Sequence, residues 1–272
     1  MYSKLKQWLY CLLVSSRVYH GSVYLALMFA EKQYLQRKQV ILVNGTAGSF
    51  KTEFLLSLLR QIMFSNPNTL WTNWAGDKRN IFITTKDTGE VIRNRMIERP
   101  AIYGKGLGKD VFNRKSIDNK VDIIKPNGKQ TLMELIKSLD KRNLQSIFID
   151  DIGNFPGQRS KALQYLKRIA TIHNCIVVVS NDISVTIDDV PYAWPESEYD
   201  SNVAIAGGFA AKRAVDLCLY LHKSKSMLIG REPVLVVKRG VAPINFKIRS
   251  AYIYFTNEVD ILTPRNYICK KE

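Results

Sequence analysis

Short apolar segments rich in β-branched residues alternate with helix-like segments along the first two-thirds of the chain. We predict buried strands over 39–43, 80–84, 121–124, 145–149 and 175–180. Apolar residues at helical spacing predict helices over 53–64, 89–97, 131–139 and 160–173. Continuous apolar strands that alternate with helices form parallel sheets with both faces covered. We therefore expect an α/β fold with a central, mostly parallel sheet flanked by helices.

The pattern changes after Gly208, where apolar segments follow one another too closely for helices to fit between them. These segments are DLCLYLHK, PVLVVKR, INFKIRS and AYIYFTN. Closely spaced strands favour antiparallel pairing, so we expect the sheet to end in antiparallel C-terminal strands. Two further stretches are predicted to be long loops, because 103–120 is basic and glycine-rich and 186–201 is acidic with two prolines.

The charge and cysteine content restrict the partners and the compartment. The 272 residues include 40 Lys and Arg against 24 Asp and Glu, a formal net charge of +16, which favours nucleic acid or an anionic membrane surface as partner. The four cysteines form no CxxC pair, which indicates a reduced, intracellular protein without a structural zinc site. The apolar stretch 8–30 contains Arg17 and His20, so we expect packed amphipathic helices there and no stable membrane insertion. Membrane association through this stretch is the alternative.

The stretch NGTAGSFKTEF joins the first predicted strand to the first predicted helix. Strand, glycine-containing turn and helix in this order are the context of a phosphate-binding loop, where backbone N–H groups and a helix N-terminus converge on a phosphate. Lys51 would reach the β- and γ-phosphates of a nucleotide, and the Thr52 hydroxyl would bind Mg²⁺. The predicted nucleotide-binding residues are Gly45, Thr46, Ala47, Gly48, Ser49, Phe50, Lys51 and Thr52.

Phe50 stands where the phosphate-loop pattern has its last glycine. A side chain there leaves the backbone N–H available if φ and ψ are negative, so we expect a loop that is altered in shape but still functional. The alternative is a chance match to a loose glycine pattern.

Two acids end the predicted strand in LQSIFIDDIGNF. Asp150 would hold Mg²⁺ through water, and Asp151 would orient or deprotonate the attacking water. The alternative role for Asp151 is the N-cap of the following turn.

Polar residues also end two later strands. Asn181 follows the strand in CIVVVSN, where it would sense the γ-phosphate or simply belong to a strand-end turn. Lys238 and Arg239 stand at the tip of the strand in PVLVVKRGVAP. They would be surface charges, or they would reach a neighbouring subunit's nucleotide in trans.

Taken together, these elements resemble the RecA-like motor domain of ring-forming helicases of the DnaB and plasmid RepA type, from about Leu35 to Phe255. The matching stretches are GTAGSFKT, FITTKDTGEVIRNRM, IFIDD, VVVSN, GGFAAKRAVDLCLYL and VVKRGVAP. The resemblance implies a RecA-like P-loop NTPase with ATP and Mg²⁺ as cofactors. It divides the chain into an N-terminal helical extension (1–34), an ATPase domain (35–258) and a C-terminal tail (259–272). The family usually carries a catalytic glutamate where Lys86 stands, so the base would be Asp87 or Asp151.

The resemblance also implies the activity. In the family, the loop after the magnesium strand grips nucleic acid in a central channel; here this region would use Arg159, Lys161, Lys167 and Arg168 for phosphate contacts. We expect an ATP hydrolase that translocates nucleic acid, with a hexameric DNA helicase of replication favoured and DNA preferred over RNA. The alternatives are a virus- or plasmid-encoded genome-packaging ATPase, and a nucleotide-switched binding or assembly protein with weak hydrolysis. The expected partners are nucleic acid and further copies of the chain in a ring.

Overall fold

The computed structural model of the chain describes residues 37–45, 47–63, 78–98, 114–182, 214–229, 232–239, 250–254 and 267–269. The strands are β1 (Val40–Gly45), β2 (Arg79–Thr84), β3 (Val121–Ile124), β4 (Leu144–Asp150), β5 (Ile176–Asp182), β6 (Leu217–Ile229), β7 (Glu232–Arg239), β8 (Ser250–Tyr254) and β9 (Tyr267–Cys269). The helices are α3 (Lys51–Met63), α4 (Gly89–Glu98), α5 (Arg114–Lys120), α6 (Leu132–Ser138) and α7 (Arg159–Ile172), with a short 3-10 helix η3 (Ile152–Asn154). The predicted extension 1–34, Thr46 and the predicted loop 186–201 lie outside the described residues.

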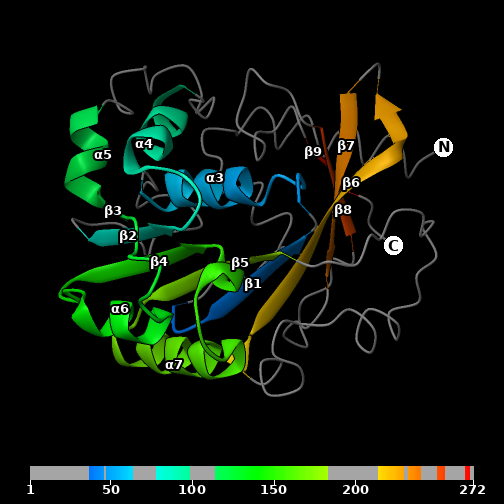
Figure 1. The fold of residues 1–272 in the computed structure, drawn as a ribbon. Helices are drawn as coiled ribbons and strands as arrows, with labels where there is room; N and C mark the ends of the chain where they lie inside the picture. The colour runs from blue at the N-terminus through cyan, green and yellow to red at the C-terminus, as the bar shows by residue number, and fades with distance from the viewer. Residues whose placement is uncertain are drawn as a thin grey trace.

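The described strands form one nine-stranded sheet in the order β3-β2-β4-β5-β1-β6-β7-β8-β9 (Figure 1). Every neighbouring pair from β3 to β6 in this order is parallel. The predicted α/β fold with a mostly parallel sheet flanked by helices is therefore confirmed. From β6 onward, each strand pairs antiparallel with the next, through β7 and β8 to β9.

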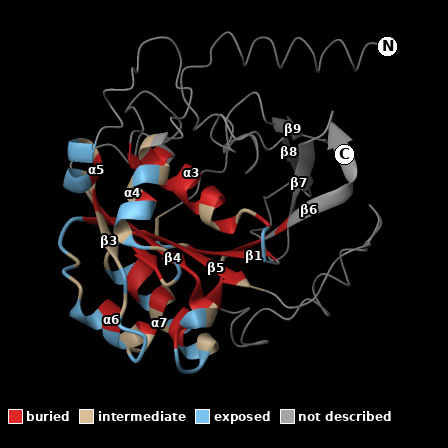
Figure 2. Ribbon diagram, turned by 45° about the horizontal axis from the view of Figure 1, so that its top comes forward, coloured by how far each residue is buried: buried red, intermediate tan, exposed pale blue. Residues whose placement is uncertain are grey.

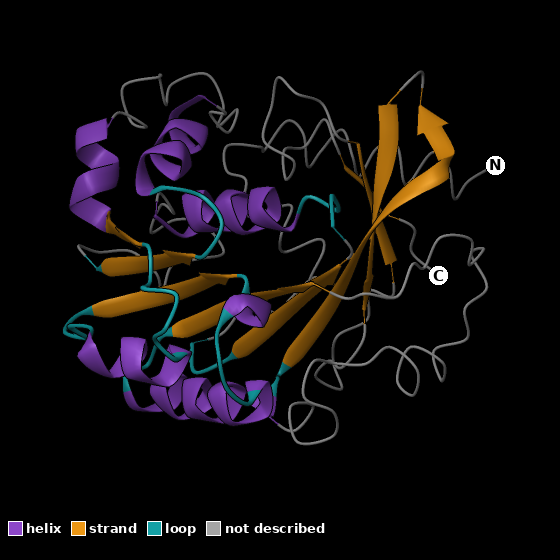
Figure 3. Cartoon of the chain, in the orientation of Figure 1, coloured by secondary structure: helices purple, strands orange, loops and turns teal. Residues whose placement is uncertain are grey.

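The sheet is covered on both faces, with α3, α4 and α5 on one face and α6 and α7 on the other (Figures 1 and 3). Successive residues of a strand point to opposite faces, so each strand supplies two cores. In β1, Ile41 and Val43 belong to the core beneath α3, whereas Val40 and Leu42 belong to the core above α7. Because both faces are buried, the central strands are apolar at nearly every position, as the red ribbons of Figure 2 show.

The helices begin and end within two residues of the predicted bounds, and α5 is an addition. It occupies the second part of the stretch predicted to be a loop, so that prediction is wrong for Arg114–Lys120. Ile117 is fully buried in the core beneath α3, and Arg114 forms an ion pair of 2.9 Å with Glu90 on α4. One anchoring apolar residue gives no periodicity in the sequence, which is why the helix was not predicted.

The two helices on the lower face begin differently. α6 starts with a capping box, in which the Thr131 hydroxyl accepts from the Glu134 backbone N–H and the Glu134 carboxylate accepts from the Thr131 N–H. At the start of α7, the side chain of Gln158 makes no capping hydrogen bond, and the first turn contains no acidic residue. None of the described helices is both long and apolar enough to cross a bilayer.

Candidate functional site

Polar side chains gather where the neighbouring parallel strands β4, β5 and β1 reach their carboxyl ends. Ligands of open α/β sheets bind at this edge. The arrangement brings the loop after β1 against the acid that ends β4, although Thr52 and Asp150 are 98 residues apart. The predicted phosphate loop and the predicted magnesium acid therefore share one site.

Gly48 and Phe50 shape the loop between β1 and α3, with φ of 78° and 60°. These values lie in the left-handed region, which glycine adopts easily and phenylalanine rarely. The expectation of a negative φ at Phe50 is therefore wrong. The Phe50 side chain packs against the core beneath α3, and its burial offsets a backbone penalty of about 1–2 kcal/mol. The backbone at this position thus has a conformation that glycine adopts easily.

Lys51, the first residue of α3, reaches back across the loop. Its Nζ donates to the carbonyl oxygen of Gly45 at 2.9 Å and forms an ion pair of 2.6 Å with Asp182 Oδ1. The lysine side chain is only 6% exposed, so its ammonium is buried beside the Gly45 carbonyl and the Asp182 carboxylate. A carboxylate from β5 therefore occupies a position where the loop lysine attracts an anion.

Asp150 is the polar centre of the site. Its Oδ2 accepts from the Thr52 hydroxyl at 2.7 Å, and its Oδ1 accepts from the Ser180 hydroxyl at 2.6 Å. The residue is 1% exposed, and both of its carboxylate oxygens accept a hydrogen bond. The two predicted magnesium ligands, Thr52 and Asp150, are thus in contact. Ser180 was not predicted, and it fixes the orientation of Asp150.

Asp182 and Lys86 add a pair of opposite charges to the site, and of the two only Asp182 was absent from the sequence predictions. Lys86 lies just after β2 and donates to Asp182 Oδ2 at 2.7 Å, so one carboxylate joins Lys86 and Lys51. Burial raises the pKa of Asp182, but the hydrogen bonds from the two lysines outweigh it and hold the pKa well below its usual value. Burial lowers the pKa of Lys86, and the contact with Asp182 reverses this and raises it. Both groups are therefore charged at neutral pH.

Asp151 is buried beside this pair. Its Oδ1 accepts from the Gly153 N–H at 2.8 Å, which confirms the alternative role as N-cap of the following turn. Its Oδ2 accepts from the backbone N–H of Asp182 at 3.2 Å and lies 3.7 Å from Lys86 Nζ. Burial raises the pKa of Asp151 to about 6. A capping role and a role in water activation are compatible, because Oδ1 accepts the capping hydrogen bond whereas Oδ2 lies beside Asp182 and Lys86.

Asn181 faces away from the loop. Because side chains alternate along β5, Ser180 and Asp182 point toward the α3 face, where Asp150 and Lys51 lie. The fully buried amide of Asn181 points to the other face and donates to Asn44 Oδ1 at 2.8 Å. The prediction that Asn181 senses the γ-phosphate is corrected, since its neighbours on either side hold the positions that face the loop.

Asp87, the other predicted base, forms its ion pair with a residue of α4. Its Oδ2 accepts from Arg95 Nη1 at 2.9 Å, and its backbone N–H donates to the Thr84 hydroxyl at 3.2 Å. Arg95 also lies 3.9 Å from the carboxylate of Glu53 on α3. Asp87 thus belongs to an ion-pair cluster between α3 and α4, and of the two predicted bases only Asp151 contacts the site network.

The four cations predicted to bind nucleic acid all lie on α7, but in different settings. Arg159 begins the helix and donates from Nη2 to the Gly153 carbonyl at 3.5 Å, close to Asp151. Lys161 and Arg168 are exposed. Lys167 forms an ion pair of 2.5 Å with Asp216, at the amino end of β6, so its charge is already compensated and the predicted phosphate contact does not fit. Of the four predicted cations, Lys161 and Arg168 are therefore the two with exposed side chains.

Lys238 and Arg239 end β7, two strands from β1. Their backbones pair with Tyr220 and Leu219 of β6. Leu219 in turn pairs with Val43, shortly before the loop. The strand end therefore lies at the level of the loop, and a trans contact with a neighbouring subunit stays a prediction.

Compared with models of known protein families and with curated proteins, the chain matches none. The assignment of an activity therefore depends on the residues and their geometry.

Proposed function

We propose that the chain is a RecA-like P-loop ATPase that uses ATP and Mg²⁺ to move along nucleic acid. The observation that carries the proposal is the 2.7 Å hydrogen bond from the Thr52 hydroxyl to Asp150. It joins the residue that follows the loop lysine to the acid that ends β4. A P-loop NTPase needs these groups together, because the lysine meets the β- and γ-phosphates while hydroxyl and carboxylate flank the magnesium ion.

The chain's own groups would bind the triphosphate as follows. Backbone N–H groups of the loop and of the first turn of α3 face the phosphates. The ammonium of Lys51 exchanges the carboxylate of Asp182 for a phosphate oxygen. Thr52 and Asp150 would hold Mg²⁺, since hydroxyl and carboxylate oxygens suit this hard cation, and the ion would neutralise charge on the phosphates. Ser180 keeps Asp150 in place.

Asp151 would accept the proton of the attacking water. A pKa of about 6 leaves its carboxylate mostly ionised at neutral pH while making it a better base than an ordinary aspartate. The ammonium of Lys86 lies 3.7 Å from the same carboxylate and opposes proton uptake there. We therefore expect hydrolysis that is slow until Lys86 moves away.

Nucleic acid as the track is supported by the charge of +16 and by the exposed cations of α7. DNA is preferred over RNA, and the working form is a homo-oligomeric ring of helicase type. If Lys238 and Arg239 act on a neighbour's nucleotide, replacing either by alanine abolishes turnover and leaves nucleotide binding nearly intact. Loss of nucleotide binding would place these residues in another role.

The first experiment measures ATP hydrolysis by the purified chain alone and with single-stranded DNA, double-stranded DNA or RNA. Lys51→Ala removes the ammonium at the loop, and Lys115→Ala removes an exposed ammonium on α5 as a matched control. Stimulation by one polymer that disappears only in Lys51→Ala supports the motor and identifies its track. Hydrolysis that persists in Lys51→Ala would refute the assigned site.

A second candidate function is a nucleotide-switched binding or assembly protein with weak hydrolysis. It is favoured by one observation, the ion pairing of Lys86 with Asp182 where a catalytic acid would stand in the motor family. Tight ATP binding without turnover under every condition, together with a nucleotide-dependent change in oligomer size, would support this candidate over the motor.

A further inference from the structure

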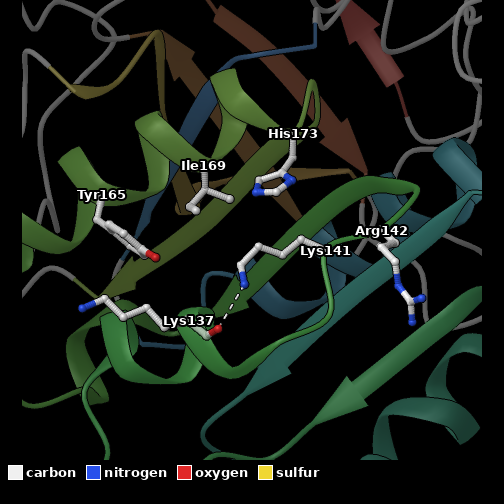
Figure 4. A pocket seen from close by; sticks show the side chains of 6 residues that line it. All are labelled: Lys137, Lys141, Arg142, Tyr165, Ile169 and His173. Atoms are coloured by element: carbon white, nitrogen blue, oxygen red, sulfur yellow. Dashed lines mark hydrogen bonds between the residues drawn. The ribbon is translucent and has the colours of Figure 1, made fainter.

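A basic pocket lies at the opposite edge of the sheet from the nucleotide site. It has a volume of about 510 Å³ and is lined by Lys137, Lys141, Arg142, Tyr165, Ile169 and His173 (Figure 4). These residues come from the end of α6, the connection to β4, and the last turns of α7. Since β4 has seven residues, its two ends are roughly 20 Å apart, so the pocket and Asp150 are separate sites.

Positive charge predominates in the pocket, because three of the described residues that line it are Lys or Arg and none is an Asp or a Glu. Lys141 Nζ donates to the carbonyl oxygens of Leu139 at 2.7 Å and Lys137 at 3.2 Å, which fixes the ammonium at the end of α6. An ammonium has three N–H donors, and these carbonyls use two. Arg142 contributes less charge, since Asp140 accepts from it at 2.9 Å. The two lysines therefore supply most of the attraction for an anion.

Tyr165 and Ile169 give the pocket an apolar part. Ile169 is buried in the core above α7, and Tyr165 is half-buried against the same core. Figure 4 shows the Tyr165 hydroxyl directed toward the ammonium of Lys141, while the ammonium of Lys137 extends away from Lys141. An aromatic side chain near ammonium groups suits a ligand that has both a planar base and a phosphate.

The surface of α7 extends this arrangement. Lys161 and Arg168 are exposed and stand four residues before and three residues after Tyr165, so all three lie on adjoining parts of the helix. Seven residues of helix place the two cations about 10 Å apart. The pocket thus opens onto a strip of positive charge, which fits an extended polyanion better than a single free anion.

We propose that the pocket between α6 and α7 binds single-stranded nucleic acid, with phosphates on Lys137 and Lys141 and a base against Tyr165. This inference rests on the proposed function, for which it identifies the contact surface. A membrane is the less suitable partner, because only Val91 and Ile172 are exposed large apolar residues among those described, and a membrane-binding helix needs a full apolar face.

The test measures binding of a fluorescein-labelled single-stranded oligodeoxynucleotide to the full chain by anisotropy, without ATP. The pocket variant carries Lys137→Ala and Lys141→Gln. Its matched control carries Lys115→Ala and Lys125→Gln, which removes two exposed charges elsewhere. We expect the pocket variant to bind about tenfold more weakly. The dependence of log K on log salt should become shallower by about 0.7 for each phosphate that the variant no longer binds, and the control should stay unchanged.

Tyr165 separates base contact from charge. Tyr165→Leu should weaken oligonucleotide binding about tenfold without changing binding to heparin, which has no bases, and Tyr165→Phe should restore it. Equal weakening in the pocket variant and its control would overturn the inference. So would a pocket variant that keeps oligonucleotide binding and no longer binds phosphatidylserine vesicles.

The inference and the proposed ATPase activity can fail separately. Lys51→Ala should bind the oligonucleotide like the unaltered chain, because the loop lies at the other edge of the sheet. If the chain binds the oligonucleotide through the pocket but hydrolyses no ATP, the inferred binding site stands and the proposed motor activity is refuted. Hydrolysis stimulated by DNA equally in the pocket variant would retain the motor and refute this site.

Discussion

Replacing Asp182 by asparagine should tighten nucleotide binding. The Asp182 carboxylate forms an ion pair of 2.6 Å with Lys51 and accepts from Lys86 at 2.7 Å, so it competes with a phosphate for the loop ammonium. Asparagine has the same shape and keeps a hydrogen-bond acceptor, but it removes the negative charge. The lysine is then available to the triphosphate without first leaving a charged partner.

The size of the effect follows from the exposure of the pair. A hydrogen bond to a charged group contributes about 1.5–3 kcal/mol when it is shielded from water. Lys51 is 6% exposed but Asp182 is 37% exposed, so solvent screening reduces the contribution to about the lower limit. If the Asp182 carboxylate competes with about 1.4 kcal/mol for Lys51, its removal lowers the Kd for nucleotide about tenfold.

The assay is equilibrium titration of a fluorescent, non-hydrolysable ATP analogue with Mg²⁺. Asp118→Asn is the matched control, because Asp118 also forms an ion pair of 2.6 Å, with Arg93, but lies on α5 away from the loop. A thermal melt of each variant shows that the fold persists. An unchanged or higher Kd for Asp182→Asn would refute the reasoning, since Asp182 would then assist nucleotide binding or play no part in it.

Three further predictions concern the loop, a helix start and a buried thiol. Gly45→Ala should abolish nucleotide binding, because a Cβ there would lie 2.8 Å from the Leu221 carbonyl oxygen, whereas Gly48→Ala meets no atom within 4 Å and should weaken binding only mildly through its φ of 78°. Comparing the two Kd values tests this difference, and equal effects would contradict it. Thr131→Ala removes the hydroxyl of the capping box and should lower the free energy of unfolding by about 1 kcal/mol in urea denaturation; no change would show that the cap contributes little. Burial raises the pKa of the Cys175 thiol to about 12, so the thiolate is scarce at mildly alkaline pH and site-resolved mass spectrometry should find Cys175 alkylated only after unfolding; rapid alkylation of the folded chain would contradict its burial.

The strands, the loop between β1 and α3, and the position of Asp150 at the end of β4 could be predicted because each leaves a local pattern. Apolar runs with turn signals predicted every parallel strand up to β5, and the position of Thr52 at a strand-to-helix junction predicted that it lies close to Asp150. Parallel strands align their carboxyl ends, so the order of the chain was sufficient for this part of the site.

The other residues of the site could not be predicted, because local sequence patterns do not show to which face of the sheet a side chain points. The sequence could not show which face of β5 the loop occupies, so Asn181 was predicted in place of its neighbours Ser180 and Asp182. A strand's period of two limits the choice to alternate residues, and Val178 lies in the core beneath α3, which selects Ser180 and Asp182. The positive φ of Phe50 was equally hidden, because phenylalanine rarely adopts such a φ.

The start of α7 has an electrostatic consequence for local stability. A helix carries partial positive charge at its N-terminus, and the first turn here adds Arg159 and Lys161 to it without an acid or a side-chain cap. The amide groups of this turn are therefore held less firmly than those of α6, whose capping box satisfies its first donors. Hydrogen exchange should be faster in the first turn of α7 than in its last, and any anion that settles beside Arg159 should slow it. The stability of the first turn of α7 thus depends on the charges near it.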